Sequence, residues 1–375
     1  MSDNQILRVL VVDDTVVYRK IVSDVLTELP NVDVVGTAHN GKAALLKVKT
    51  LKPDLLTLDI EMPEVNGLEV LAQLQKTAPH VGAVMLSTLT SEGGVMTMKA
   101  LELGAFDFIP KPQSGTMAAN KKAVQKALEP ILAAFSRSQR MLGRLPKSRP
   151  AARTVRQNKP AMTTRPSQTF TARTRPSSII GIGISTGGPN ALAQLLPRLP
   201  SDINVPVVIV QHMPPMFTKS LAKSLNQKCP LDVHEAIDGE PLKPNAVYIA
   251  PGGKQMKIVA GADGKQRVIK ITNDPPENSC KPSVDYLFRS IAEMYVGRAT
   301  GVIMTGMGSD GTQGLHQMKR NGAFVIAQNE ASCVVFGMPK EPIEAGIVDV
   351  VAPLNGIASA VLSSISYRGS GRPGK

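Results

Sequence analysis

An acid-free, proline-rich stretch in the middle of the chain limits its possible folds more than any other feature. No Asp or Glu occurs between Pro130 and Ser201, whereas eleven Lys or Arg residues lie between Arg137 and Arg175. Prolines at positions 146, 150, 160, 166 and 176 interrupt this region, which has almost no apolar periodicity after Leu145. A segment of this composition repels itself and buries too little apolar surface to form a core. We therefore predict a disordered linker that divides the chain into two domains.

This division predicts four segments in the 375-residue chain. They are an N-terminal domain over 1–125, a linker over 126–176, a C-terminal domain over 177–368 and a disordered tail over 369–375. The formal net charge is +13, and because eleven of these charges belong to the linker, the rest of the chain carries only +2. The linker is either a solvated tether or a docking strip for an acidic partner or nucleic acid.

The sequence predicts a soluble, cytoplasmic protein without direct membrane insertion. Its longest apolar runs, such as Leu7–Val12 and Ile179–Ile184, are far shorter than the roughly 20 residues of a membrane span, and the N-terminus has no export signal. The three cysteines, Cys229, Cys280 and Cys333, lie about 50 residues apart without Cys-x-x-Cys or Cys/His pairing in the sequence. This spacing favours neither a disulfide framework nor a zinc site.

The N-terminal part alternates short β-branched runs with segments of helical period. This pattern predicts an α/β domain, a doubly wound, flavodoxin-like parallel sheet with helices on both faces. A fifth helix is expected over Lys121–Met141. The strands are expected over Leu7–Val12, Val32–Thr37, Asp54–Leu58, Val81–Ser87 and Ala105–Ile109.

Five polar residues follow strands of this predicted sheet: Asp13, Asp14, Asp59, Thr88 and Lys111. Because the carboxyl ends of parallel strands meet at one edge, these side chains are expected to share a pocket. Three acids in one pocket favour a hard cation such as Mg²⁺, with Asp13 and Asp14 as ligands. Asp59 is then the phosphoryl-accepting nucleophile, Lys111 its charge partner and Thr88 a hydroxyl that moves toward the phosphoryl group. Taken singly, each residue could instead be a helix cap or a turn residue.

In order and spacing, these motifs resemble response-regulator receiver domains. The matching segments are Val-Val-Asp13-Asp14, Leu58-Asp59-Ile-Glu61-Met-Pro63, Ser87-Thr88 and Pro110-Lys111-Pro112. The resemblance implies phosphorylation of Asp59 by a histidine kinase of a two-component system. It also implies that Asp59 and the backbone carbonyl of Glu61 contribute to the metal site. Phe108 stands where many receivers have Tyr, so the aromatic switch residue lacks a hydroxyl here.

The C-terminal part again alternates strands and helices, which predicts a second α/β parallel sheet. A β-rich insert is expected between Ala246 and Thr272, with a turn at Ala262-Asp263-Gly264. The other strands are expected over Ile179–Ile184, Val205–Val210, Leu231–Ala236, Thr300–Thr305 and Phe324–Gln328. Helices are expected over Ala191–Leu199, Thr218–Gln227, Val284–Tyr295 and Gln313–Arg320.

The first of these strands ends in a glycine-rich turn that contains Ser185. The turn fits two generic motifs, the exposed nucleophilic serine of Gly-x-Ser-x-Gly and a dinucleotide-phosphate cradle. A dinucleotide site wants an acidic residue at the end of the next strand, but this chain has Gln211-His212 there. A histidine in that place can act as general base to Ser185. Asp310, just past a later strand, completes a predicted triad of Ser185, His212 and Asp310.

Each triad member also has an ordinary structural reading as a cap, a structural histidine or a turn residue. Together, however, the motifs resemble the chemotaxis methylesterase family (CheB). The matching segments, in the family's order, are Gly-x-Ser-Thr-Gly-Gly-Pro-x-Ala, Gln-His-Met-Pro, Pro282-Ser-Val-Asp285, Thr-Gly-Met-Gly-x-Asp-Gly and Gly337-Met-Pro.

The resemblance implies a protein-glutamate methylesterase and protein-glutamine glutaminase that acts on the cytoplasmic helices of methylated chemoreceptors. A chemotaxis histidine kinase is the implied phosphodonor. Thr186 and Met307 are candidate oxyanion donors through their backbone N–H groups. The serine chemistry needs no cofactor, so Mg²⁺ belongs to the receiver alone. The unphosphorylated receiver is expected to pack across the Ser185 cleft. Cys280, where some relatives have His, is assigned no catalytic role.

Two other functions remain open from the residues alone. A DNA-binding response regulator fits the predicted receiver and the pI of about 9.7, but it needs a compact basic recognition helix after the linker. The C-terminal domain is instead a large α/β unit of balanced charge, so no nucleic-acid partner is expected. A nucleotide-dependent enzyme at the glycine-rich turn is the second alternative.

Overall fold

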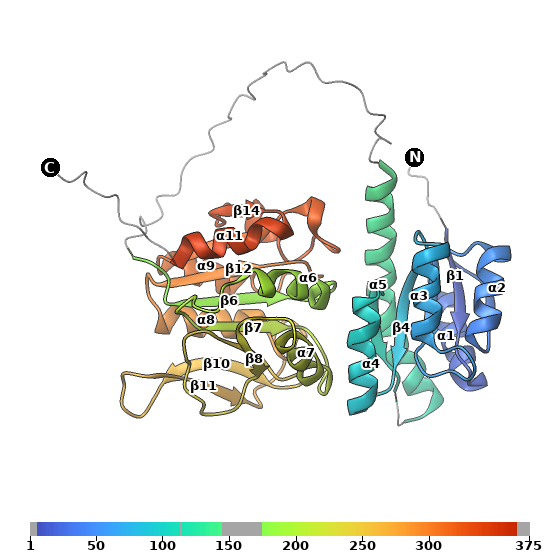
Figure 1. Cartoon of the computed structure of the whole chain (residues 1–375), viewed down its shortest axis with the longest axis horizontal. Coiled ribbons are helices and arrows are strands. Elements are labelled where there is room, and N and C mark those ends of the chain that lie inside the picture. The colour runs from blue at the N-terminus through green and yellow to red at the C-terminus, as the bar shows by residue number, and fades with distance from the viewer. Residues whose placement is uncertain (1–5, 113–114, 145–174, 366–375) are drawn as a thin grey trace, which may run out of the picture.

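The computed structural model describes residues 6–112, 115–144 and 175–365, which form two α/β domains (Figure 1). The N-terminal domain contains one five-stranded parallel sheet with the strand order β2-β1-β3-β4-β5. This order confirms the predicted flavodoxin-like fold, with its switch point between β1 and β3. Its strands are β1 (Leu7–Val12), β2 (Val32–Ala38), β3 (Leu55–Asp59), β4 (Gly82–Ser87) and β5 (Asp107–Pro110). Its helices are α1 (Val16–Glu28), α2 (Gly41–Leu51), α3 (Gly67–Thr77), α4 (Ser91–Glu102) and α5 (Met117–Arg144).

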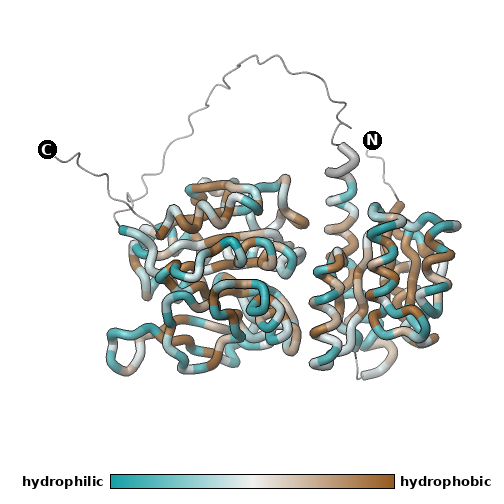
Figure 2. The backbone as a smooth tube through the Cα atoms, viewed as in Figure 1, coloured by the Kyte–Doolittle hydropathy of each residue, from teal (hydrophilic) through white to brown (hydrophobic). Residues whose placement is uncertain are grey.

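Burial and capping explain these elements. Strands β1 and β3 are buried on both faces, as their near-continuous apolar sequences require, and Figure 2 shows hydrophobic strands between more polar helices. Helix α3 begins with a capping box, in which Asn66 accepts a hydrogen bond from the Glu69 backbone and the Glu69 carboxylate accepts one from the Asn66 backbone. Such caps define where the helices begin and thus where each strand-to-helix loop lies.

Helix α5 continues past residue 125, where the sequence predicts the N-terminal domain to end. Leu128, Leu132 and Phe135 are buried in the same apolar cluster as α1, and the Phe135 ring packs edge-on against Phe106 at 5.1 Å. This packing makes 126–135 part of the N-terminal core instead of the linker. Residues 145–174 of the predicted linker, and the predicted tail over 369–375, lie outside the described residues.

The C-terminal domain contains a seven-stranded sheet with the order β14-β13-β12-β6-β7-β9-β8 and a separate two-stranded hairpin. All pairs in the larger sheet are parallel. Its strands are β6 (Ile179–Ile184), β7 (Val207–Gln211), β8 (Asp232–Glu235), β9 (Ala246–Ile249), β12 (Ala299–Ile303), β13 (Phe324–Gln328) and β14 (Val350–Ala352). The order reverses between β12 and β6, so the carboxyl end of β6 lies at a topological switch point.

Helices cover both faces of this sheet. One face packs on α6, α7 and α11, and the other on α8, α9, α10 and the hairpin. The helices are α6 (Gly188–Leu195), η1 (Leu196–Arg198), α7 (Phe217–Asn226), α8 (Val284–Met294), α9 (Thr312–Arg320), η2 (Glu330–Ser332), α10 (Lys340–Glu344) and α11 (Leu354–Ile365). Among the described helices, none combines the length and the apolar character that crossing a bilayer requires.

The β-rich insert is smaller than predicted. Strand β9 was expected in the insert, but it pairs with β7 and β8 inside the main sheet. Only β10 (Gln255–Ala260) and β11 (Arg267–Thr272) form the antiparallel hairpin. A short apolar run has the same sequence pattern in an insert strand as in a strand of the main sheet. The partner strands that decide between these two positions lie elsewhere in the sequence.

The glycines of β6 allow α8 to pack directly on the strand, which gives a stability prediction. A Cβ at Gly183 would lie 2.3 Å from Val284 Cγ1 and 3.1 Å from Ile303 Cδ1. We expect Gly183→Ala to lower the unfolding free energy by about 1–3 kcal/mol, the usual cost of overpacking a core. Urea unfolding followed by circular dichroism measures this change. As a control, Gly261→Ala should have little effect because its Cβ would meet nothing closer than 3.4 Å; equal midpoints for both variants would contradict the prediction.

The two domains contact each other through α4, which packs against α7 and α6 (Figure 1). The Phe108 ring lies 4.6 Å from the Phe217 ring of α7, which joins the apolar clusters of the two domains. Beside this contact, the Glu102 carboxylate accepts a hydrogen bond from Ser224 Oγ at 2.7 Å and pairs with Lys228 Nζ at 2.5 Å. The interface therefore has an apolar centre and a charged edge.

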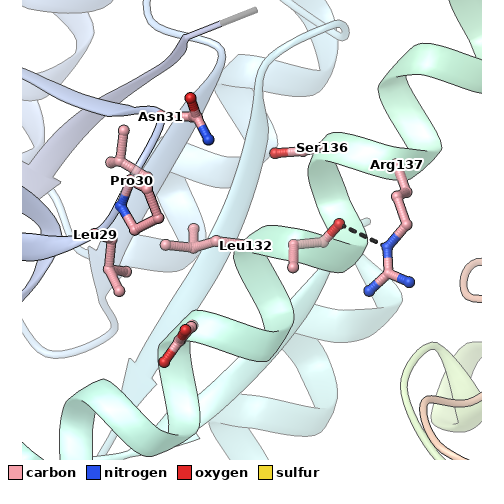
Figure 3. Close-up of a pocket in the computed structure, with 9 residues that line it drawn as sticks. Leu29, Pro30, Asn31, Leu132, Ser136 and Arg137 are labelled. Carbon is pink, nitrogen blue, oxygen red and sulfur yellow. Dashed lines mark hydrogen bonds between the residues drawn. The ribbon is translucent and has the colours of Figure 1, made fainter. Parts of the chain in front are cut away.

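A hollow of about 330 Å³ lies between the end of α1 and α5 (Figure 3). Leu29, Pro30 and Leu132 form its apolar wall, and Arg137 donates to the Ala133 carbonyl at its rim. The hollow lies at the amino-terminal edge of the sheet, next to the start of β2. It is therefore separate from the carboxyl edge where the predicted site residues gather.

Candidate active site and receiver pocket

Ser185 lies directly after β6, on the tight turn that leads into α6. Its backbone N–H donates to the Thr305 carbonyl at 3.0 Å, and its carbonyl accepts from Gly188 N at 2.7 Å and from Gln211 Nε2 at 2.9 Å. The turn requires Gly187, whose φ of 75° is left-handed. These bonds hold the Ser185 backbone at the switch point of the sheet. Its hydroxyl makes no hydrogen bond within the described part of the chain.

His212 lies directly after β7, the neighbour of β6. Its backbone N–H donates to the Ile184 carbonyl at 3.1 Å, which places His212 beside the residue that precedes Ser185. Its Nε2 lies 2.8 Å from Asp310 Oδ2. The structure thus brings the predicted histidine and carboxylate into direct contact and places the predicted serine on the adjacent strand end.

Asp310 is buried and follows β12. Its carboxylate accepts hydrogen bonds from Ser283 Oγ at 2.8 Å, Val284 N at 2.7 Å and Asp285 N at 3.1 Å, where α8 begins. Asn278 Nδ2 donates a further bond at 3.0 Å. Burial alone would raise the pKa of Asp310, but the His212 bond and these donors lower it to about 2. Asp310 therefore remains ionised and holds the His212 ring in place.

Sequence reasoning missed Ser283 and Asn278 as parts of this site. A signal for Ser283 was present, because a serine before an apolar helix is typical of an N-cap, and a helix N-terminus attracts a carboxylate. Asn278 precedes α8 in an irregular segment, and no local pattern indicates its contact with Asp310, 32 positions away.

Cys280 lies much nearer to the site than predicted. Its Sγ lies 3.8 Å from His212 Nδ1, across 68 positions of sequence. Cys280 does not follow a strand, but the segment before α8 brings its thiol beside His212. Burial lowers the pKa of His212, whereas the bonds to Asp310 and Cys280 raise it.

The two predicted oxyanion donors flank Ser185 in different ways. Thr186 follows it in the chain, and its carbonyl accepts from Thr305 Oγ1 at 3.0 Å. Met307 follows Gly306, where a Cβ would lie only 2.7 Å from Ser185 Cβ. The β12 loop therefore passes directly beside the serine, and only glycine fits at position 306.

The five predicted polar residues of the N-terminal domain gather at one edge of its sheet. Carboxylate oxygens of Asp13, Asp14 and Asp59 lie within 4.8 Å of one another. Lys111 Nζ lies 2.7 Å from Asp13 and 2.6 Å from Asp59. Burial raises the pKa of Asp59 to about 6, although the Lys111 ammonium opposes this shift. Thr88 Oγ1 lies at the rim, 3.3 Å from Glu61 Oε1. Buried carboxylate oxygens of this kind are typical of a Mg²⁺ site.

Comparison with known proteins gives matches over both domains. The family described as CheB methylesterase matches residues 180–361, and the response regulator receiver domain matches residues 9–121. A protein-glutamate methylesterase/protein-glutamine glutaminase of Desulfotalea psychrophila is 56% identical over 96% of this chain and 98% of its own length. A protein of the same description from Trichodesmium erythraeum is 41% identical over 96% of this chain and 99% of its own length.

Among solved structures, the crystal structure of the Thermotoga maritima CheB methylesterase catalytic domain is 43% identical. It covers 50% of this chain and 98% of that chain, with a TM-score of 0.49. The identity of 56% across nearly the whole of both chains in the first comparison is far above what unrelated sequences share. The chain therefore belongs to the CheB methylesterase family, in the form that carries an N-terminal receiver domain.

Proposed function

We propose that this protein hydrolyses glutamyl methyl esters, and deamidates glutamines, on the cytoplasmic helices of chemoreceptors. The observation that carries the proposal is the bond of 2.8 Å between His212 and an ionised Asp310, beside the strand end that holds Ser185. A carboxylate that orients a histidine next to a partly buried serine is the arrangement of acyl-transfer hydrolases. Release of methanol from a methylated receptor tests the proposal.

In the proposed reaction, Ser185 attacks the side-chain carbonyl of the substrate. His212 accepts the serine proton through Nδ1, because Nε2 is bonded to Asp310. The protonated ring then passes this proton to the departing methanol or ammonia, and water hydrolyses the acyl-enzyme by the reverse proton path. The backbone N–H groups of Thr186 and Met307 stabilise the oxyanion and contribute about 3 kcal/mol each.

The receiver pocket controls this reaction in the proposal. Asp59 accepts a phosphoryl group from a chemotaxis histidine kinase, and Lys111 balances the added charge. The pocket fits a hard cation because three carboxylates share it with one ammonium. Asp13, Asp14, Asp59 and the Glu61 carbonyl would hold Mg²⁺, which supplies charge neutralisation for the phosphoryl oxygens when bound.

The contact between the domains supports a route from the phosphoryl group to the active site. Thr88 lies between the pocket and α4, and Phe108 packs on Phe217 of the catalytic domain. In the proposed switch, Thr88 moves toward the phosphoryl group and Phe108 follows it. Movement of these residues withdraws the apolar contact between Phe108 and Phe217 of α7, and the receiver separates from the catalytic domain.

Charge reversal at the interface gives a prediction for this switch. Glu102→Lys should raise the activity of the unphosphorylated protein about fivefold, because it replaces an ion pair of about 1 kcal/mol with a repulsion against Lys228. The double variant Glu102→Lys/Lys228→Glu should restore the low activity. Initial rates of methanol release without phosphodonor measure both variants.

The matched control is Glu92→Lys, which makes the same charge change at an exposed position in the first turn of α4. This variant should behave like the wild type. Activation by Glu92→Lys equal to that by Glu102→Lys would show that the effect comes from net charge and not from the interface.

A further inference from the structure

We propose that Cys280 and His212 form an inhibitory binding site for a thiophilic divalent cation, with Zn²⁺ as the natural occupant. Cys280 Sγ and His212 Nδ1 lie 3.8 Å apart. Tetrahedral Zn²⁺, with bonds of about 2.3 Å to sulfur and about 2.1 Å to nitrogen, needs its two ligand atoms about 3.6 Å apart. The pair therefore has nearly the separation that a shared zinc ion requires, without rearrangement of the backbone.

The orientation of the His212 ring suits metal binding. Its Nε2 is bonded to Asp310 Oδ2 at 2.8 Å, which leaves Nδ1 as the ligand atom on the side of Cys280. A metal-ligating histidine usually donates its second ring N–H to a carboxylate, which fixes the tautomer and strengthens the ligand. Asp310 is itself held by four further donors, from Asn278, Ser283, Val284 and Asp285. The outer part of a zinc site is thus already assembled.

The second ligand is also held in place. Cys280 and Glu277 exchange two backbone hydrogen bonds, at 2.8 and 3.1 Å, and Gln255 Nε2 donates to the Cys280 carbonyl at 3.4 Å. Both ligand side chains keep a path to solvent, since Cys280 is only partly buried and the His212 side chain is 14% exposed. A rigid pair of ligands loses little entropy when a metal binds.

The character of the ligands selects the metal. Within the described residues, two clusters have the spacing of metal ligands, and only the one with His212, Cys280 and Asp310 contains sulfur and nitrogen. The receiver cluster offers carboxylate oxygens alone, which suit Mg²⁺. Thiolate and imidazole favour Zn²⁺ and Co²⁺ over Mg²⁺. The ligand types of the two sites therefore direct Mg²⁺ to the receiver pocket and Zn²⁺ to the His212–Cys280 pair.

Inhibition follows because the metal binds the catalytic nitrogen of His212, and this inference rests on the proposed function. Nδ1 of His212 is the atom proposed to accept the Ser185 proton, so a metal bound there removes the general base. Binding converts the Cys280 thiol to a thiolate and releases its proton to solvent. Two protein ligands leave the remaining positions of the ion to water, which makes the binding reversible by chelators.

Cobalt spectroscopy tests the site without reference to activity. The full-length protein is titrated with Co²⁺ in excess Mg²⁺, which saturates the receiver pocket. The wild type should show a near-ultraviolet thiolate-to-cobalt charge-transfer band with one Co²⁺ per chain. Cys280→Ala should lose the band, whereas Cys280→His should retain Co²⁺ but without the band. Cys333→Ala, which removes a thiol facing the Gln328 carbonyl, should keep it.

Zinc inhibition is then measured with the same proteins, as the fraction of each variant's own activity that remains. We expect chelator-reversible inhibition of the wild type, and at least a tenfold higher Zn²⁺ concentration for half-inhibition of Cys280→Ala, because a direct ligand matters at least as much as the outer partners that change affinity about 10–100-fold. A wild type without the charge-transfer band, or equal zinc sensitivity of wild type and Cys280→Ala, would overturn the proposal. Failure of the proposed esterase function would leave the cobalt result intact, so the two failures are distinguishable.

Discussion

Ser185→Ala is expected to reduce methanol release from methylated receptor by about 10⁴-fold or more, because loss of a nucleophilic serine removes the covalent route. The alanine keeps the backbone bonds to Thr305, Gly188 and Gln211, so the fold should remain. The rate of methanol release by Asp310→Asn should also fall by about 10⁴-fold, since an amide no longer orients the His212 tautomer. Methanol assays and thermal unfolding of each variant measure activity and fold separately.

Ser309→Ala is the matched control for this experiment. Ser309 is exposed and adjacent to Asp310, and its hydroxyl makes no hydrogen bond within the described residues. Its substitution should leave the rate within about twofold of the wild type, as expected for a surface change. Retention of more than a hundredth of the activity by a folded Ser185→Ala protein would contradict the assignment of the nucleophile.

Asp59→Asn is expected to abolish stimulation by a phosphodonor while leaving the unstimulated rate. The carboxylate of Asp59 is the proposed phosphoryl acceptor, and an amide lacks its nucleophilic oxygen. Coupling between two sites in a protein is usually 1–3 kcal/mol, so the wild type should be stimulated about 5- to 150-fold by acetyl phosphate and Mg²⁺. Methanol release with and without the phosphodonor gives the ratio, and incorporation of labelled phosphate gives the stoichiometry.

Asp54→Asn makes the same chemical change just before the opposite end of β3. Asp54 accepts from the Arg8 backbone at 2.9 Å and is remote from Lys111. This variant should still incorporate phosphate and respond to the phosphodonor. An Asp59→Asn protein that is stimulated as strongly as Asp54→Asn would place the phosphoryl acceptor elsewhere.

Local pattern was sufficient for most strands and for the order of the site residues. Strands β1, β6 and β13 have the predicted bounds, because buried parallel strands form short apolar runs between turn residues. Pattern failed where a segment's environment depends on distant partners. Strand β9 lies in the main sheet because β7 and β8 flank it. The helix over Lys121–Met141 was predicted from its pattern, but its packing in the receiver core through Phe135 was not.

The sequence by itself determined two α/β domains, the strand ends that bear Ser185, His212, Asp310 and Asp59, and membership of a family. It could do so because strand periodicity and strand-end motifs are local properties of the chain. Only the tertiary structure decided that Cys280 contacts His212 and that Asn278 anchors Asp310, across 68 and 32 positions. These contacts depend on the path of an irregular segment over the sheet edge. That path is set by packing and hydrogen bonds among distant residues, which no local pattern records.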